Sequence, residues 1–296
     1  MSFVASPAVR AYAAQRGVDL GALAAATGRA TLTRDDVDRR LSGDAEAASA
    51  GPNYSRHWDV DHGQFGLVTQ EPMPRMAQIA AANLSAANAL IPQVTHHDRA
   101  DMRRIEAFRK SLAEEAAARG VKLTALAFHV KALARCLLEF PRFNASLSAD
   151  GGTLIFKRYV HVGVAVDTPH GLMVPVIRDA DVKGLWRIAA DIAELASRAQ
   201  ARKLRAEEMG GASMSISNLG GIGGSAFTPI VNPPEVAILG LTRTETVPVW
   251  EEGAWAPVPM VPLDLSYDHR VVNGADAARF LARYAALLAD PRRMAI

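Results

Sequence analysis

Residues Leu263 to Phe280 read LDLSYDHRVVNGADAARF. Apolar and polar residues alternate from Leu263 to Tyr267, which is the period of a half-buried strand. From Gly274 onward the apolar residues recur at the spacing of a helix. His269 therefore falls in a turn between a strand and a helix. Because neutral imidazole takes up a proton near pH 7, a histidine held at such a point is a candidate general base.

A second stretch, from Met214 to Gly224, reads MSISNLGGIGG. Its glycines imitate a dinucleotide-binding fingerprint, but the proline-rich residues that follow, 226–234, cannot open the helix that such a site requires. Two interpretations stay open. The glycines form a tight turn where backbones approach closely, or Ser217, at the end of the predicted strand, donates a hydrogen bond to a developing oxyanion.

The N-terminal residues carry helix signals of their own. Ser6, Pro7 and Gly17 supply an N-cap, a proline in the first turn and a glycine stop. Thr33 and Asp36 resemble a capping box, with Asp36 in place of the usual Glu, and begin a second helix. Two helices of this size would enclose only a very small core.

The chain divides into three parts by composition. We expect a small two-helix module in residues 1–41, a flexible linker rich in Ser, Gly, Asp and Ala in residues 42–58, and one large domain in residues 59–296. Alternating helix and strand patterns in the large domain predict an α/β fold, a two-layer α+β sandwich with a mixed sheet. The predicted helices are 75–90, 102–118, 125–138 and 185–203, and the predicted strands are 94–96, 143–147, 154–159, 161–167, 171–177, 214–219, 236–241 and 261–267.

Composition excludes several classes of function. The chain has 296 residues, 49% of them hydrophobic and 22% charged, with a net charge of +2. So small and dispersed an excess argues against nucleic acid binding. We expect no membrane span, because apolar runs stay well short of ~20 residues. The single cysteine, Cys136, cannot form an internal disulfide, which favours a reducing compartment such as the cytoplasm.

The other histidines are predicted to be structural or solvated, and we expect no metal site. His96 and His97 are neighbours in a strand and therefore face opposite ways. His161 begins a strand. His129 lies in an apolar helix and is predicted to be a hydrogen-bonded core group, and Cys136, in the same helix, a small buried hydrophobe.

Taken together, these stretches resemble the dihydrolipoamide acyltransferases, the acyltransferase components of 2-oxo acid dehydrogenase complexes, within the chloramphenicol acetyltransferase-like superfamily. The run from His269 to Gly274 is similar to the family signature His-x-x-x-Asp-Gly, with Asn273 in place of Asp. The resemblance extends from about Phe65 to Ile296, and the sequence after Gly274 looks most like the pyruvate-type, acetyl-transferring branch. The similar stretches are 143–147, 162–169, 217–224, 227–230, 234–240 and 266–275.

The resemblance implies a role for each residue of the signature. His269 would be the general base that takes a proton from a thiol, and Ser217 would hydrogen-bond the oxyanion of the tetrahedral intermediate. Asn273 would orient the loop of the active site, with Arg75 as its expected partner. Asp268, Arg270 and Gly274 are expected to support the site.

Substrates and assembly also follow from the resemblance. Family members move an acetyl or similar short acyl group between a dihydrolipoyl thioester and coenzyme A, at a site between the subunits of a homotrimer. A hydrophobic C-terminal knob joins family trimers into a cubic core, and residues 292–296 form a weaker knob, which favours a lone trimer. None of the six lysines has the sequence context of a lipoylated lysine, so the lipoyl group is expected in trans, from a lipoyl-bearing protein.

The first module resembles the peripheral subunit-binding domain of the same complexes. That domain grips a partner, either the 2-oxo acid dehydrogenase or the dihydrolipoyl dehydrogenase subunit, through two arginines. Arg10 matches the first of them. Thr31 falls where the second should lie, and Arg29 is the nearest substitute.

Two other functions remain open at this point. The chain could be an acyltransferase that uses coenzyme A thioesters and an acceptor other than a lipoyl group. It could also be a structural or scaffold subunit of a dehydrogenase complex, although the intact His269 and Ser217 argue against that.

Overall fold

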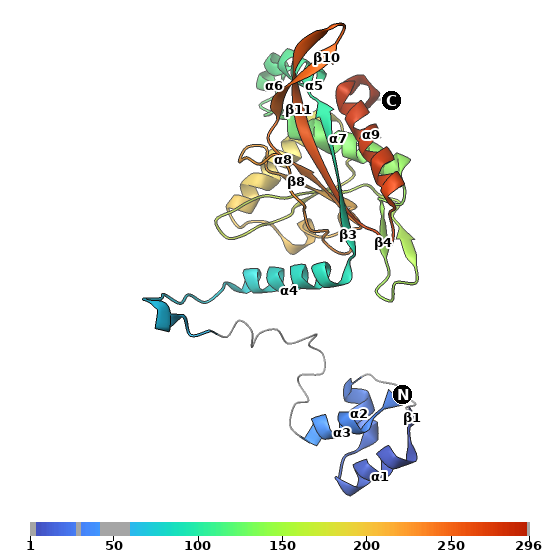
Figure 1. Ribbon diagram of the computed structural model, residues 1–296. Coiled ribbons are helices and arrows are strands. Elements are labelled where there is room, and N and C mark those ends of the chain that lie inside the picture. The colour runs from blue at the N-terminus through green and yellow to red at the C-terminus, as the bar shows by residue number, and fades with distance from the viewer. Residues whose placement is uncertain (1–3, 28–30, 42–59, 295–296) are drawn as a thin grey trace. The chain divides into compact units, whose positions relative to one another are not determined.

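The computed structural model describes residues 4–27, 31–41 and 60–294 of the chain (Figure 1). The chain divides into two compact units, Met1–Glu71 and Pro72–Ile296. The predicted linker, residues 42–58, and Arg29 lie outside the described residues. No helix in the described ranges is long and apolar enough to cross a bilayer.

The described residues of the first unit form three α-helices where the sequence predicted two: α1 (Pro7–Gln15), α2 (Leu20–Thr27) and α3 (Arg34–Leu41). Two short parallel strands, β1 (Val4–Ala5) and β2 (Thr31–Leu32), pair beside them, and a 3₁₀ turn, η3 (His62–Phe65), follows. The prediction missed α2, which has Gly21 in its first turn. The side chain of Asp19 accepts hydrogen bonds from the backbone amides of Gly21 and Ala22 at 2.7 and 3.3 Å, and so satisfies donors that the start of a helix leaves free.

The predicted N-cap of α1 is confirmed, because the Ser6 hydroxyl accepts from the Val9 amide at 3.3 Å. At the start of α3 the Asp36 carboxylate accepts from the Thr33 amide at 2.9 Å, which is one of the two hydrogen bonds of the predicted capping box. The same carboxylate also accepts from the Thr33 hydroxyl at 2.9 Å. The small core that these helices enclose consists of Ala5, Ala13, Leu23, Ala24, Leu32 and Val37.

The second unit is built on a seven-stranded mixed sheet. Its path runs β10 (Glu245–Glu251), β11 (Ala254–Asp268), β9 (Ala237–Leu241), β8 (Met214–Asn218), β6 (Val162–Val164) and β7 (Val176–Ile177), and β3 (Gln93–Asp101) pairs with β11. The inner pairs β6–β8 and β8–β9 are parallel, and the remaining pairs are antiparallel. A separate hairpin, β4 (Ala145–Leu147) and β5 (Leu154–Phe156), lies beside it.

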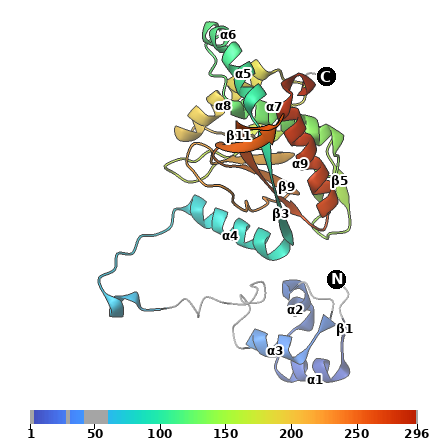
Figure 2. The same cartoon turned by 45° about the horizontal axis from the view of Figure 1, so that its top comes forward.

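Helices form the second layer, so the mixed α/β architecture is as predicted (Figures 1 and 2). The helices of this layer are α5 (Arg103–Ser111), α6 (Ala113–Ala118), α7 (Ala125–Glu139), α8 (Leu185–Gln200) and α9 (Gly274–Ala289), with short 3₁₀ turns η4 (Ala206–Glu208) and η5 (Pro291–Met294). Helix α4 (Arg75–Leu90) lies apart from them (Figure 1), and its Ala87 packs with Val231 and Ile238. The central helix, α7, packs against α8, α9 and strand β6.

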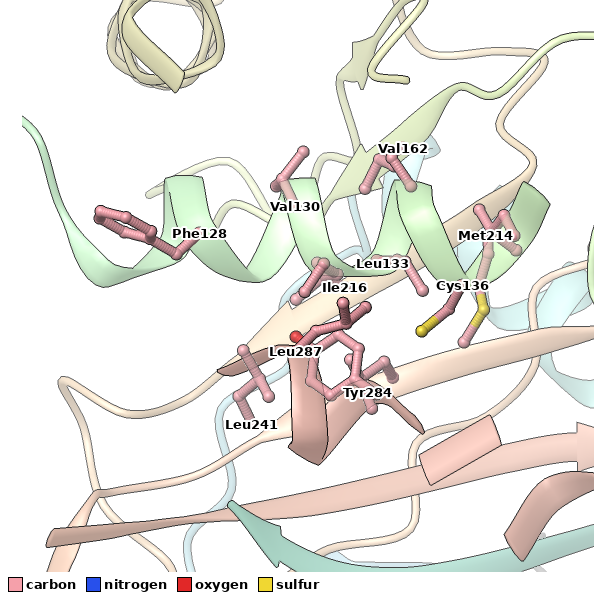
Figure 3. Close-up of a cluster of buried hydrophobic side chains, with 14 of the residues drawn as sticks. Phe128, Val130, Leu133, Cys136, Val162, Met214, Ile216, Leu241, Tyr284 and Leu287 are labelled. Carbon is pink, nitrogen blue, oxygen red and sulfur yellow. The ribbon is translucent and has the colours of Figure 1, made fainter. Parts of the chain in front are cut away.

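The main core lies between α7, α9 and the sheet (Figure 3). Helix α7 is apolar on nearly every side, and Phe128, Leu133 and Cys136 are fully buried, as the sequence predicted for Cys136. Ile216 from β8 and Tyr284 from α9 approach α7 from below in Figure 3. Burying a large aliphatic or aromatic side chain of this kind stabilises a fold by about 1.5–3 kcal/mol.

Alternation along β11 gives the sheet a second, polar face. Leu263, Leu265 and Tyr267 belong to the core beneath the helices. Asp264 and Ser266 therefore face the opposite side, together with Asp268, and all three are buried. The segment 220–236 is tied to this polar face, because the Asp264 carboxylate accepts from the Phe227 amide at 3.2 Å and the Gln93 side chain accepts from the Val231 amide at 2.7 Å.

Some predicted boundaries were wrong. The single helix expected over 102–118 breaks at Leu112 into α5 and α6, where the Ser111 hydroxyl donates to the Phe108 carbonyl at 2.8 Å. Strands β3 and β11 are longer than expected, and β10 was missed. Strand β10 pairs with β11 in a hairpin that contains prolines, which usually interrupt strands. Pro248 and Pro257 are nevertheless register partners. Strand β10 ends the strand order, and proline is tolerated in an edge strand.

Candidate active site

His269 is the first residue after β11, as predicted, and its side chain is exposed. Its backbone amide donates to the Pro92 carbonyl at 3.1 Å, which anchors the turn to the start of β3. The imidazole lies over the Tyr267 ring, with 5.8 Å between the centroids and an interplanar angle of 34°. A fixed backbone and an aromatic support thus hold an imidazole that remains accessible to substrate.

The residues that flank His269 hold the turn. The buried Asp268 carboxylate accepts from the backbone amide, Nε and Nη2 of Arg270, at 2.7 to 3.2 Å. These hydrogen bonds to Asp268 raise the pKa of Arg270 above its ordinary value. The Asp268 carbonyl also accepts from the amides of Val271 and Val272. Asp268 and Arg270 therefore support the position of His269 from both sides.

Asn273 is the N-cap of α9. Its side-chain oxygen accepts from the Asp276 amide at 2.9 Å, a role in which Asn and Asp are about equally effective. Gly274, the first residue of the helix, lies beside the Tyr267 hydroxyl, which would make ordinary van der Waals contact, at 3.6 Å, with a Cβ at that position. Asparagine in place of aspartate therefore keeps the geometry of the turn and removes one negative charge.

Ser217 is near the end of β8, with its side chain partly exposed on the polar face. On one side its register partner is Gly240 of β9. On the other side lies Ala165, whose amide donates to the Ile216 carbonyl at 2.9 Å. The glycines that follow form a tight turn, with Gly223 and Gly224 at φ values of 154° and 87°, as the first interpretation of this stretch predicted.

Ser217 and His269 of one chain lie at opposite ends of the sheet. Ser217 is level with Gly240, and Gly240 with Asp264 of β11. His269 follows Asp264 by five positions along an antiparallel strand, which separates the two side chains by about 15 Å along the strand and about 10 Å across it. A single chain therefore cannot place both groups on one carbonyl.

Each end of the sheet borders its own cavity. A cavity of about 390 Å³ next to the His269 turn is lined by residues that include Asn83, Leu90, Ser148, Glu235, Asp268 and Arg270. A second cavity, of about 340 Å³, lies beyond the end of β8 on the helix side of the sheet, where its lining includes Leu126, His129, Asn218, Leu241 and Arg243.

Arg75, at the start of α4, is exposed and makes no side-chain hydrogen bond or ion pair with any described residue, so its predicted pairing with Asn273 is not formed within one chain. In the first unit, Arg10 donates from Nε to the Ala5 carbonyl at 3.1 Å.

Sequence reasoning missed a buried carboxyl group, Glu235. It is 6% exposed, and Oε1 accepts from the Ser215 hydroxyl at 2.9 Å, whereas Oε2 has no hydrogen-bond partner among the residues that the structure describes. Burial raises the pKa of Glu235 to about 7, although the Ser215 hydrogen bond works in the opposite direction. A lone Glu between Pro234 and an apolar strand was the only signal for it in the sequence.

The other histidines have structural partners. His129 is buried, as predicted, and its Nδ1 lies 2.7 Å from the Tyr284 hydroxyl. Burial lowers the pKa of His129 to about 4. Nδ1 of His97 lies 2.6 Å from the Asp264 carboxylate, a contact that was not predicted. Within the described ranges, no group of three His, Cys, Asp or Glu side chains could hold a metal ion.

Comparison with known proteins places this geometry in a family. Residues 66–296 match the family model of the 2-oxoacid dehydrogenases acyltransferase (catalytic domain). The dihydrolipoyllysine-residue acetyltransferase component of the pyruvate dehydrogenase complex from Azotobacter vinelandii is 47% identical over 97% of this chain and 46% of its own length. The corresponding component from Pseudomonas aeruginosa is 46% identical over 98% of this chain and 54% of its own. The chain thus spans about half the length of the curated relatives it matches.

Solved structures agree with the sequence relatives. One comes from crystallographic and enzymatic investigations of a serine, a histidine and an asparagine in the catalytic mechanism of the Azotobacter vinelandii dihydrolipoamide acetyltransferase. Another is the cubic core of a pyruvate dehydrogenase multienzyme complex. Each is 51% identical, covers 80% of this chain and 98% of its own, and superposes with a TM-score of 0.79.

Proposed function

This chain belongs to the family of 2-oxoacid dehydrogenase acyltransferases, and on that premise we propose that it moves an acetyl or similar short acyl group between a dihydrolipoyl thioester and coenzyme A. The observation that carries the proposal is the turn at the end of β11, which presents His269 on a rigid backbone four positions before Asn273. In the Azotobacter enzyme, the serine and asparagine under investigation lie at the same intervals from the histidine as Ser217 and Asn273 do here.

The proposed reaction needs one base and one hydrogen-bond donor. His269 takes the proton of the attacking thiol, and the thiolate sulfur forms a bond to the carbonyl carbon of the thioester. The Ser217 hydroxyl donates to the oxygen that becomes negative. The intermediate then collapses, its original C–S bond breaks, and the departing thiolate takes the proton back from the imidazolium. No electrons are gained or lost, and no acyl-enzyme forms.

Two copies of the chain are needed for this chemistry. His269 and Ser217 stand at opposite ends of one sheet, so we assign the base to one subunit and the oxyanion donor to its neighbour. A homotrimer would give each subunit one neighbour for each end, and the exposed apolar residues of α4 support an assembly. A larger cubic core, and the pairing of Arg75 with Asn273 across the interface, also stay predictions.

The partners are proposed from the family. The lipoyl group would come from a lipoyl-bearing protein. It and coenzyme A would be the two substrates of the site. The first unit, with Arg10 and Arg29, is proposed to be a peripheral subunit-binding module that contacts the 2-oxo acid dehydrogenase or the dihydrolipoyl dehydrogenase subunit. The chloramphenicol acetyltransferase-like class and a cytoplasmic location likewise stay predictions.

The test is transfer of acetyl from acetyl-CoA to dihydrolipoamide, followed by release of the free coenzyme A thiol. We expect His269→Ala to lower turnover by ~10²–10⁴ and Ser217→Ala by ~10²–10³, with folding unchanged by circular dichroism. Wild-type turnover in His269→Ala would contradict the assignment of the base. Turnover with another acceptor but none with dihydrolipoamide would show that the acceptor is not a lipoyl group. Inactivity with every acceptor would favour a structural or scaffold subunit.

A further inference from the structure

Ser217 has two neighbours on the polar face, and they differ greatly in size. On the β6 side, Ala165 contributes one methyl group. On the β9 side, Gly240 contributes no side chain, and the aromatic ring of Phe227 occupies its place. A Cβ added to Gly240 would lie 2.6 Å from Cε1 and 2.7 Å from Cζ of that ring, so only glycine fits beneath it. Phe227 therefore takes the position of Ser217's nearest side-chain neighbour across the strands.

The backbone of Phe227 is anchored to β11, because its amide donates to the Asp264 carboxylate at 3.2 Å. Asp264 is itself 2.6 Å from Nδ1 of His97. Across this face, Ser217, the Phe227 ring and a hydrogen-bonded carboxylate follow one another in that order. The space on this side of Ser217 is therefore bounded by the Phe227 ring, with the Asp264 carboxylate behind it.

This arrangement restricts what can lie next to an oxyanion at Ser217. A thioester carbonyl that accepts from the Ser217 hydroxyl must place its alkyl chain to one side of it. The Phe227 ring is partly exposed and apolar and therefore complements an alkyl group. On the other side Ala165 contributes only a methyl group, and the segment that leads into β7 brings Val174, whose Cγ1 would lie 3.0 Å from a Cβ added to Gly163. An alkyl chain that lies on the β9 side of Ser217 therefore meets the Phe227 ring, which leaves room for only a short one.

We infer that Phe227, seated on Gly240, is the residue that sets acyl specificity, and that it restricts the enzyme to acetyl and similarly short acyl groups. The inference rests on the proposed function and names a determinant of its substrate class.

The test compares acetyl-CoA, butyryl-CoA and isobutyryl-CoA as donors to dihydrolipoamide in wild type, Phe227→Ala and Phe227→Leu. Because one methylene in a pocket changes kcat/KM by ~10–200-fold, we expect Phe227→Ala to raise the butyryl-to-acetyl ratio of kcat/KM at least ~10-fold, with Phe227→Leu intermediate. The matched control is Phe156→Ala on the β4–β5 hairpin, a ring that is 48% exposed, and it should leave the ratio unchanged.

Gly240→Ala supplies an independent arm. The added methyl group collides with the Phe227 ring, so this substitution should lower acetyl transfer in the wild-type background and have a smaller effect in the Phe227→Ala background, where only the 3.1 Å contact with Cβ of Asp264 remains. That non-additivity is the signature of two groups in contact.

The outcomes separate the two proposals. If wild type transfers no acyl group to dihydrolipoamide, the proposed function fails and this inference fails with it. If wild type transfers acetyl but Phe227→Ala and Phe227→Leu keep the wild-type ratio, the inference is overturned and the proposed function stands.

Discussion

Ser217 and His269 stand at opposite ends of one sheet, because β8 is parallel to β9 and β9 is antiparallel to β11. Ser217 is level with Asp264, and His269 lies beyond the far end of the strand that holds Asp264. No rotation of either side chain closes a gap of about 18 Å between positions fixed by ladder hydrogen bonds. This relationship leads to the first prediction.

Mixing two inactive variants should restore activity. If His269 of one subunit works with Ser217 of its neighbour, then mixed oligomers of His269→Ala and Ser217→Ala contain some interfaces in which both residues are intact. Random exchange in equal amounts gives about a quarter of the wild-type interfaces. The measurement is acetyl transfer after co-expression or subunit exchange. The separate variants are the controls, and activity that never exceeds theirs would show that the two residues do not act across an interface.

The buried Glu235 should give the protein a pH-dependent stability. Its pKa is raised to about 7 from 4.5, so the folded protein holds this proton more tightly than the unfolded chain does. The free energy of unfolding therefore falls as pH rises from about 4.5 to 7, by on the order of 3 kcal/mol from this group alone. Glu235→Gln removes that loss, so the variant should gain stability relative to wild type as pH rises through this window.

The comparison of variants is needed because His129 acts in the opposite sense. Its pKa is lowered to about 4 from 6.5, so its contribution to stability is complete above about 6.5 and is lost as pH falls toward 4. Urea unfolding at several pH values, with Glu245→Gln at an exposed position as a matched control, isolates the contribution of Glu235 to the free energy of unfolding. Parallel curves for wild type and Glu235→Gln between pH 5 and 8 would mean that Glu235 titrates normally.

The buried contact between His129 and Tyr284 should contribute to stability. Tyr284→Phe keeps the packing of the ring but removes the hydroxyl that lies 2.7 Å from Nδ1 of His129. A buried imidazole left without its partner costs about 1–3 kcal/mol, measured as a lower urea midpoint. Tyr159→Phe, at a ring 41% exposed, is the control. Equal urea midpoints for the two variants would show that the contact between His129 and Tyr284 adds nothing to the free energy of unfolding.

Helix α4 should mediate assembly. Met76 and Ile79 are 51% and 47% exposed, yet helical spacing puts them on the same side as Ala87, which is buried against the body of the unit. We expect Ile79→Lys to lower the mass found by light scattering and to reduce acetyl transfer in parallel. Asn88→Lys, on the opposite side of the helix, adds the same charge as a control. An unchanged mass for Ile79→Lys would exclude this part of α4 from the interface.

The sequence predicted the elements better than their arrangement. Apolar periodicity located α7, α8 and the strand before His269, because these elements bury one face or every side. It missed β10, where Pro248 breaks the pattern, and α2, whose cap by Asp19 is a single side chain. Strand order depends on contacts between distant segments, so no local pattern shows that Ser217 is level with Asp264. For the same reason, no local pattern shows that the Phe227 ring packs over Gly240.

The strand register that places Ser217 beside Gly240 and Asp264, far from His269, affects a newly made chain. If His269 is the base and Ser217 the oxyanion donor, as proposed, a folded but solitary copy holds one of them at each end of the sheet, with no place where both act on the same thioester. Such a copy would be catalytically silent until it meets another. The specific activity of the protein should then depend on its concentration, and dilution below the dissociation constant of the assembly would protect acyl-CoA from wasteful turnover by orphan chains.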